Sequence, residues 1–254
     1  MFFKSQIAVA TTYRIDLYGR WVISLFGVVL YVALWSVTSK DQGELFKLIA
    51  YFSLFYGVLN NMHSGRVALW IAEAINSGSL NNFLIKPINF PLLQVIRGLT
   101  LAMIRIAVPV VILIGGCVFF PHIFAPLSLV NFLAFLLFSV LGLVIWNVLI
   151  VSLSTIAFAG TEINSTMTVL DLVIALLKGA YIPATLFPLW ATKGLSLTFI
   201  PYLASYPIKL YQEPIVWNDF LFSLGIALGW VGIFSFTAAY FYKRGLRNYE
   251  AAGA

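Results

Sequence analysis

Long apolar runs separated by short polar breaks dominate the chain. Because a helix needs roughly 20 predominantly apolar residues to cross the hydrocarbon core of a bilayer, each long run is a predicted membrane span. The runs that are long enough lie at about residues 21–38, 45–66, 95–120, 127–158, 165–184 and 220–242. We therefore expect an all-α polytopic membrane protein with six transmembrane helices, in which residues 1–254 form a single domain.

Ahead of the first span, apolar side chains recur at the three- and four-residue spacing of a helix. They are Phe3, Ile7, Ala10, Tyr13, Leu17 and Trp21. An amphipathic helix of this kind lies along the membrane surface, so we expect an interfacial helix over residues 1–18. Arg14 falls on the same face and would have to extend its guanidinium into water.

Three segments depart from the simple alternation of spans and breaks. A polar break at residues 60–65 interrupts the second apolar run, and a further helical stretch follows it to residue 75. Residues 76–91 are rich in Asn, Gly and Pro, which indicates a loop carrying a short helix. Residues 183–218 contain five prolines, and irregular backbone cannot face lipid. We therefore expect this third segment, between spans five and six, to be external and partly re-entrant.

The composition excludes an ordinary soluble protein. Hydrophobic residues make up 61% of the chain and charged residues 9%, with a mean hydropathy of +0.98. Soluble domains are about 45–50% apolar and about 25% charged. So few charged side chains cannot cover the surface of a soluble domain of this size, and lipid must take the place of water.

The basic residues indicate which side of the membrane the termini face. Six spans put both termini on one side, and the lysines and arginines of that side are Lys4, Arg14, Arg20, Arg66, Lys86, Arg97, Lys243, Arg244 and Arg247. Those of the other side are Lys40, Lys47, Lys193 and Lys209. Because Lys and Arg are in excess on cytoplasmic loops, we expect both termini in the cytoplasm. The net charge of +6 comes from scattered residues without a basic stripe, so we expect no nucleic-acid partner.

Motifs that carry catalytic chemistry are missing from the sequence. The dipeptide Gly-Lys does not occur, which excludes a GxxxxGK[ST] phosphate loop, and there is no GxSxG motif. His63 and His122 stand alone, without the spacing of a metal site, and Cys117 is a single cysteine. We expect no enzymatic activity, and no cofactor or metal bound by this chain.

Three charged residues fall inside predicted spans: Arg105, Asp171 and Lys178. A charge at the centre of a span costs on the order of 2.5 to 3.5 kcal/mol on insertion scales, so each should have a reason. Asp171 and Lys178 lie seven residues apart, on one face of a helix but too far for a direct bond. Arg105 is then the natural partner of Asp171, either as a structural pair between helices or as part of a transport path. Lys178 could also extend toward the membrane surface.

A stripe of small residues runs along the last span. Gly225 and Gly229 form a GxxxG pattern that Gly232 extends, and such stripes let two helices approach closely. We favour packing within the chain over a dimer contact.

Three segments resemble a known family of membrane proteins. Residues 71–97 read IAEAINSGSLNNFLIKPINFPLLQVIR and resemble the loop after the second span in permeases of type-2 ABC exporters, in the small six-span branch. The segment of residues 179–211 resembles the external segment of that family through Gly-Ala-Tyr-Ile-Pro, which includes Pro183, and through Phe187-Pro188 and Tyr206-Pro207. The tail of residues 247–253, RNYEAAG, is similar to the family's Tyr-Glu-rich ending.

The resemblance implies partners and roles that the residues alone did not. Two permeases, identical or homologous, would associate in the bacterial cytoplasmic (inner) membrane, with two ABC ATPase subunits beneath them that bind ATP and Mg. The short helix between spans two and three would be a coupling helix seated in the ATPase, and its residues would be Glu73, Gly78, Leu80, Leu84 and Pro87. The interfacial helix would also border the ATPase. Without these roles, the same residues would form only a solvated connection.

Two other classes remain as alternatives. An ion-coupled secondary transporter acting without an ATPase would use Asp171 and Arg105, although the two halves of the chain show no inverted repeat. A membrane-embedded enzyme is disfavoured, because no nucleophile, metal set or carboxylate pair can be assembled. No residue selects the transported substrate.

Overall fold

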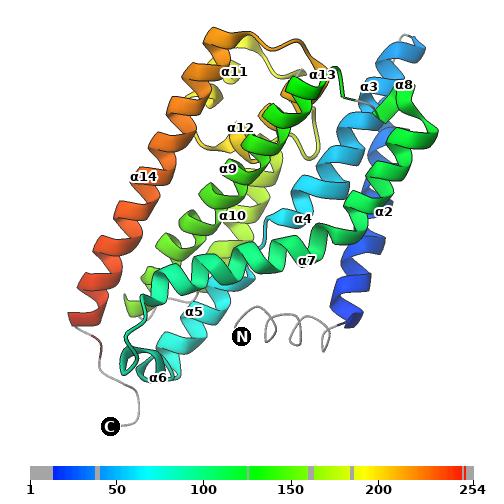
Figure 1. Ribbon diagram of the computed structural model, residues 1–254. Coiled ribbons are helices and arrows are strands. Elements are labelled where there is room, and N and C mark those ends of the chain that lie inside the picture. The colour runs from blue at the N-terminus through cyan, green and yellow to red at the C-terminus, as the bar shows by residue number, and fades with distance from the viewer. Residues whose placement is uncertain are drawn as a thin grey trace.

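A computed structural model describes residues 14–37, 41–124, 126–159, 163–183, 186–247 and 249. All the secondary structure within these ranges is helical (Figure 1). Its four longest helices are α2 (Arg14–Ser36), α7 (Phe90–Phe119), α9 (Leu129–Ser154) and α14 (Trp217–Arg247). The segments of these helices that are long and apolar enough to cross a membrane are Leu17–Ser36, Phe90–Phe119, Leu129–Ala159 and Trp217–Arg247. The predicted all-α fold is therefore confirmed.

The predicted interfacial helix falls mostly outside the described residues. Its last five residues, 14–18, are the first turn and a half of α2 and continue directly into the first long helix. The candidate span within α2 begins at Leu17, so the interfacial helix stays a prediction.

The second apolar run forms a helix that changes type and then breaks. It consists of α3 (Gln42–Phe52), the π-helix η1 (Ser53–Leu59) and α4 (Asn60–Met62). The break at residues 63–65 separates α4 from α5 (Arg66–Asn76), as the polar residues predicted. In Figure 1 this break lies well away from both ends of the bundle.

Shorter helices complete the fold. Those in the first half are α6 (Asn81–Leu84) and α8 (Pro121–Phe124). Those in the second half are the 3₁₀ helix η2 (Thr155–Ala159), α10 (Ile163–Leu177), α11 (Leu189–Ser196), α12 (Ile200–Leu203) and α13 (Ser205–Gln212). The proline-rich segment is thus more helical than expected, and α12 and α13 are buried against α9.

The core is organised around α9. This helix packs against α14, α13, α12, α5 and α7, and glycines permit the closest approaches. A Cβ atom at Gly142 would lie 2.4 Å from the carbonyl oxygen of Tyr202, and one at Gly98 would lie 1.6 Å from Oδ1 of Asn147. Position 142 therefore needs glycine, because a Cβ there would meet backbone, whereas a Cβ at Gly98 would require the Asn147 side chain to move.

The stripe of small residues on α14 does not pack within the described part of the chain. A Cβ atom at Gly225, Gly229 or Gly232 would meet no heavy atom within 4 Å. The expectation of packing within the chain was wrong, because α14 turns another face toward α9.

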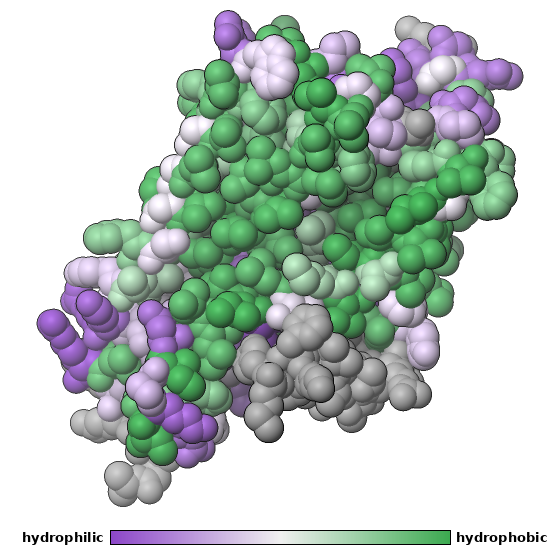
Figure 2. All heavy atoms as spheres, in the orientation of Figure 1, coloured by the Kyte–Doolittle hydropathy of each residue, from purple (hydrophilic) through white to green (hydrophobic). Residues whose placement is uncertain are grey.

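The outer surface has the polarity of a membrane protein. Figure 2 shows apolar residues across the middle of the molecule and hydrophilic residues gathered near its two ends. The start of α2, α6 and the end of α14 lie at one end, whereas α8, α11 and α13 lie at the other (Figure 1). Below, these are called the α6 end and the α11 end.

Candidate functional site

The connection between α5 and α7 is a compact hairpin at the α6 end. The amide of Ser77 donates to the carbonyl of Glu73 (2.9 Å), and the amide of Leu80 donates to the carbonyl of Ala74 (2.8 Å). Between them Gly78 has a φ of 74°, in the left-handed region that favours glycine at the end of a helix. Asn89 then caps α7, its side chain accepting from the amide of Leu92 (3.1 Å). The loop and short helix expected at residues 76–91 are both present.

The predicted coupling residues fall into two groups. Glu73, Leu84 and Pro87 are exposed and Gly78 is half-buried, but the side chain of Leu80 is 0% exposed and belongs to the main hydrophobic core. Leu80 therefore anchors the hairpin from inside and cannot touch a partner. The reason is the turn at Gly78, which directs the chain back over α5.

Sequence reasoning missed two apolar residues at the tip of the hairpin. Ile85 is 81% exposed and Ile88 is 46% exposed, beside Leu84 at 42%. We call Leu84, Ile85 and Ile88 the tip residues. The signal that could have found them is the run of large apolar side chains inside an otherwise polar loop.

Aromatic rings hold the hairpin to the rest of the bundle. The ring of Phe83 lies 5.2 Å from that of Phe90, and Phe90 stacks on Tyr242 of α14 at 5.9 Å. Phe158 lies 5.9 Å from Tyr242 and 5.7 Å from Tyr249. These five residues, which we call the aromatic anchor, join the hairpin, η2 and the end of α14.

Two further contacts stiffen α5 itself. The hydroxyl of Tyr249 donates to the carbonyl of Ile75 in the last turn of α5 (3.1 Å). The guanidinium of Arg97 lies over the ring of Trp70, 3.6 Å from its centroid, and so ties α7 to α5. The helix that leads into the hairpin is therefore held on two sides.

The three intramembrane charges do not pair as predicted. Arg105 is buried on α7, and its backbone carbonyl accepts from the indole of Trp21 (3.0 Å). Asp171 forms no ion pair with Arg105, and the nearby charge that acts on it is that of Lys178. Asp171 does not reach Arg105 because α10, which carries Asp171, packs against α5 and α12.

Lys178 is 5% exposed, and its ammonium donates to Oδ1 of Asn60 (3.0 Å). It directly follows α10, whereas Asn60 begins α4, beside the break in the second apolar run. Asp171 and Lys178 line one polar cavity with Asn60 and His63. The structure thus brings two of the three predicted charges together and leaves Arg105 apart.

The predicted residues of the external segment occupy different surroundings. Pro183 and Pro207 are buried, Phe187 is half-buried, and Pro188 is exposed at the start of α11. Pro207 is the third residue of α13, where the missing amide hydrogen leaves no helical bond unmade.

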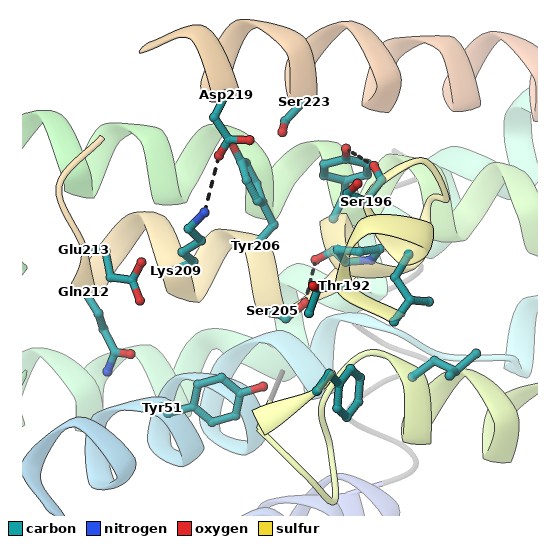
Figure 3. A pocket seen from close by; sticks show the side chains of 15 residues that line it. Tyr51, Thr192, Ser196, Ser205, Tyr206, Lys209, Gln212, Glu213, Asp219 and Ser223 are labelled. Atoms are coloured by element: carbon teal, nitrogen blue, oxygen red, sulfur yellow. Dashed lines mark hydrogen bonds and ion pairs between the residues drawn. The ribbon is translucent and has the colours of Figure 1, made fainter. Parts of the chain in front are cut away.

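A second cavity, of about 380 Å³, lies at the α11 end, and Phe187 is part of its lining. Figure 3 shows Lys209 of α13 and Asp219 of α14 pointing toward each other, with Nζ and Oδ2 3.4 Å apart. The hydroxyl of Tyr206 donates to the same carboxylate at 3.5 Å, and burial raises the pKa of Tyr206 to about 12. This hydroxyl therefore stays protonated at physiological pH.

Within the described ranges, no group of three or more His, Cys, Asp or Glu side chains could hold a metal ion. The candidate functional elements are therefore the hairpin and the two cavities.

Comparison with known proteins agrees with this architecture. A family model described as "ABC-2 family transporter protein" matches residues 41–253, which is most of the chain. No curated protein and no solved structure matches. The resemblance found in the sequence is thereby confirmed. The helical bundle with its long apolar helices and the family match together show that the chain belongs to the ABC-2 transporter family and is a multi-pass membrane protein.

Proposed function

We propose that this chain is the permease subunit of an ABC exporter, driven by separate ATPase subunits. The observation that carries the proposal is the hairpin between α5 and α7. Its tip residues are apolar and exposed at the end of the molecule, while Leu80 and the aromatic anchor hold its base in the core. An exposed apolar tip can bind a partner protein, and a rigid base can pass the movement of that partner on to the bundle.

Two further helical segments support six spans. Residues 42–62 form a continuous helical run of α3, η1 and α4, which at about 1.5 Å per residue extends roughly 31 Å. Helix α10 is apolar but shorter, with 15 residues, and its last turn is prolonged by the bond from the amide of Lys178 to the carbonyl of Ile174 (2.8 Å). Together with the four long helices, these segments would make six crossings.

The proposed orientation places the α6 end in the cytoplasm of a bacterial cell. Lys86 lies on the hairpin, and the exposed residues Lys243, Arg244 and Arg247 close α14 at the same end. Excess basic residues favour the cytoplasmic side. Both termini would then be cytoplasmic, and α11 to α13 would face outward.

In this function α5 transmits movement. The tip residues would sit in a groove of the ATPase, with Glu73 and Pro87 beside them, and closure of two ATPase subunits around ATP and Mg would displace the hairpin. Because α5 is held to α7 and to Tyr249, which follows α14, the displacement would shift the helix as a rigid body. The break at residues 63–65 would absorb that shift within the membrane. A second permease, identical or homologous, would complete the pathway, and this chain would supply no catalysis.

The test is capture of the ATPase from native membranes. Tagged full-length chain should bring down an ABC ATPase, and Leu84→Arg combined with Ile85→Arg should abolish the capture because a charge would enter the apolar contact. Leu189→Arg, at an apolar residue of α11 that is 80% exposed, is the matched control and should retain it. Gel filtration in detergent checks that each variant is folded. Capture that is unchanged in the double variant, or absent in the wild type, would contradict the proposal.

The polar cavity that contains Asp171 and Lys178 favours one alternative, an ion-coupled transporter without an ATPase. Flux through the purified chain alone in liposomes, driven by a proton or sodium gradient, would establish it.

A further inference from the structure

The break between α4 and α5 opens onto a polar cavity. The cavity measures about 500 Å³ and is lined by residues of α2, η1, α4, α9 and α10. Non-helical backbone inside a membrane is tolerated where it is buried in protein or lines a cavity, and substrate sites of transporters are often formed by interrupted helices. The π-helix η1 directly precedes the break, and π segments are frequent at functional sites.

Hydrogen bonds from several helices build the wall of this cavity. The amide of Asn61 donates to the carbonyls of Tyr56 (2.9 Å) and Gly57 (3.0 Å) and to the hydroxyl of Ser24 on α2 (3.2 Å). The hydroxyl of Tyr56 donates to the carbonyl of Ala180, just after α10 (2.9 Å). The site is therefore formed before any ligand enters.

Spare hydrogen-bond donors face the interior. The ammonium of Lys178 has three N–H groups, of which one is used on Asn60. Both ring nitrogens of His63 are buried near the backbone of Gly142, and neither makes a hydrogen bond of normal geometry to the described residues. The ring of His63 is held beside that of Trp146, with centroids 5.5 Å apart. A buried ammonium with free donors calls for an anionic acceptor.

The acidic residue of the cavity acts on Lys178 only from a distance and does not occupy its free N–H groups. Asp171 lies seven residues before Lys178, about 10 Å along the axis of α10, and no ion pair joins the two side chains. Its side chain is exposed, unlike that of Lys178. The carboxylate therefore marks the rim of the cavity, and the ammonium marks its interior.

Apolar side chains lie on the same rim. Ile23 of α2 is 71% exposed and Leu172 of α10 is 61% exposed, and both line the cavity. The cavity thus reaches the apolar outer face of the bundle between α2 and α10, where a hydrocarbon chain could lie.

We propose that this cavity binds an amphipathic ligand through an anionic phosphate or carboxylate group, with Lys178 as its counter-ion and the imidazole of His63 as a hydrogen-bond donor. The apolar part of the ligand lies along Ile23 and Leu172. The inference rests on the proposed permease function, because it assigns the class of substrate that the permease carries.

The test measures equilibrium binding to the purified full chain in detergent. The probes are radiolabelled oleate and dioleoylphosphatidate, with dioleoylglycerol as the uncharged analogue. Wild type should bind both anionic lipids and not dioleoylglycerol, and Lys178→Met should weaken binding about tenfold or more, the value of a lost hydrogen bond to a charged group. Lys178→Arg should retain most of the affinity, and Lys193→Met, at an exposed lysine on α11, is the matched control.

A second variant protects the test against misfolding. Thr168→Trp fills the cavity from an exposed position of α10 and leaves every charge in place, so it should also weaken binding. Equal binding by wild type and Lys178→Met, equal binding of dioleoylglycerol, or no binding of either anionic lipid would overturn the proposal. If equimolar inorganic phosphate displaced phosphatidate, the hydrocarbon chains would add no affinity, and the proposal that the ligand is amphipathic would be wrong. Since ATPase capture uses the hairpin, failed binding with intact capture would contradict this inference alone.

Discussion

The two ends of α5 lie in contrasting surroundings. Its C-terminal end is enclosed by the aromatic anchor and by Leu80, which is fully buried. Its N-terminal end begins at the break of residues 63–65, beside a polar cavity with a buried ammonium. In the proposed function, α5 would move as a unit about the irregular backbone at its N-terminal end. Its packed C-terminal end would transmit force, and its N-terminal end would adjoin the ligand.

The largest effect is expected where the packed end is broken. Leu80→Arg would bury an unpaired charge in the core, which costs several kcal/mol, and the variant should fail to fold. Fluorescence-detected gel filtration would measure the loss. Leu84→Arg, four residues on but exposed, should remain monodisperse, and loss of folding in that control would show that the tip is part of the core.

At the cavity end, Asn60→Leu removes the acceptor of Lys178. A hydrogen bond to a charged group is worth about 1.5 to 3 kcal/mol, and the leucine leaves the buried ammonium without it. The midpoint of thermal unfolding should fall, and Asn60→Asp should restore it through a direct ion pair. An unchanged midpoint in Asn60→Leu would mean that another group already satisfies Lys178.

The aromatic anchor should tolerate little added volume. A Cβ atom at Gly245 would lie 2.3 Å from Cδ2 of Phe158, so Gly245→Ala should destabilise the chain by about 1 to 3 kcal/mol through overpacking. Gly229→Ala on the same helix meets open space and is the matched control. Equal unfolding midpoints for the two variants would show that the anchor is looser than its geometry indicates.

The smallest effect is expected from a single hydroxyl. Tyr249→Phe keeps the ring of the anchor but removes the hydrogen bond to Ile75, worth about 0.5 to 1.5 kcal/mol. Hydrogen exchange of the last turn of α5 should rise. Tyr240→Phe, at a more exposed tyrosine of α14, should leave that exchange unchanged. Faster exchange in both variants would show that the effect comes from α14 as a whole.

Local features of the site followed from local sequence. The polar residues 60–65 predicted the break, the Asn, Gly and Pro of the hairpin predicted its loop and short helix, and Gly78 marks the end of a helix through its positive φ. The burial of Leu80 and the exposure of Ile85 did not follow, because both are large apolar residues of one loop and only the packing of the hairpin on the core separates them.

The sequence also could not predict which side chains on different helices contact each other. Arg105 was the expected neighbour of Asp171, yet the packing of α10 places Asp171 and Lys178 beside the break in the second apolar run. Charge alone could not identify Asn60, a neutral residue, as the acceptor of Lys178.

The sequence by itself determined that the chain is helical and crosses a membrane, because unbroken apolar runs of sufficient length leave the backbone no other way to satisfy its hydrogen bonds in lipid. The tertiary structure decided which helix lies inside the bundle. In α9, 72% of the most apolar stretch is buried, against 6% in α2. Lipid and protein interior are equally apolar, so hydropathy cannot distinguish a face turned to the core from one turned to the bilayer. Close packing at glycines and polar contacts between helices determine which faces are turned to the core.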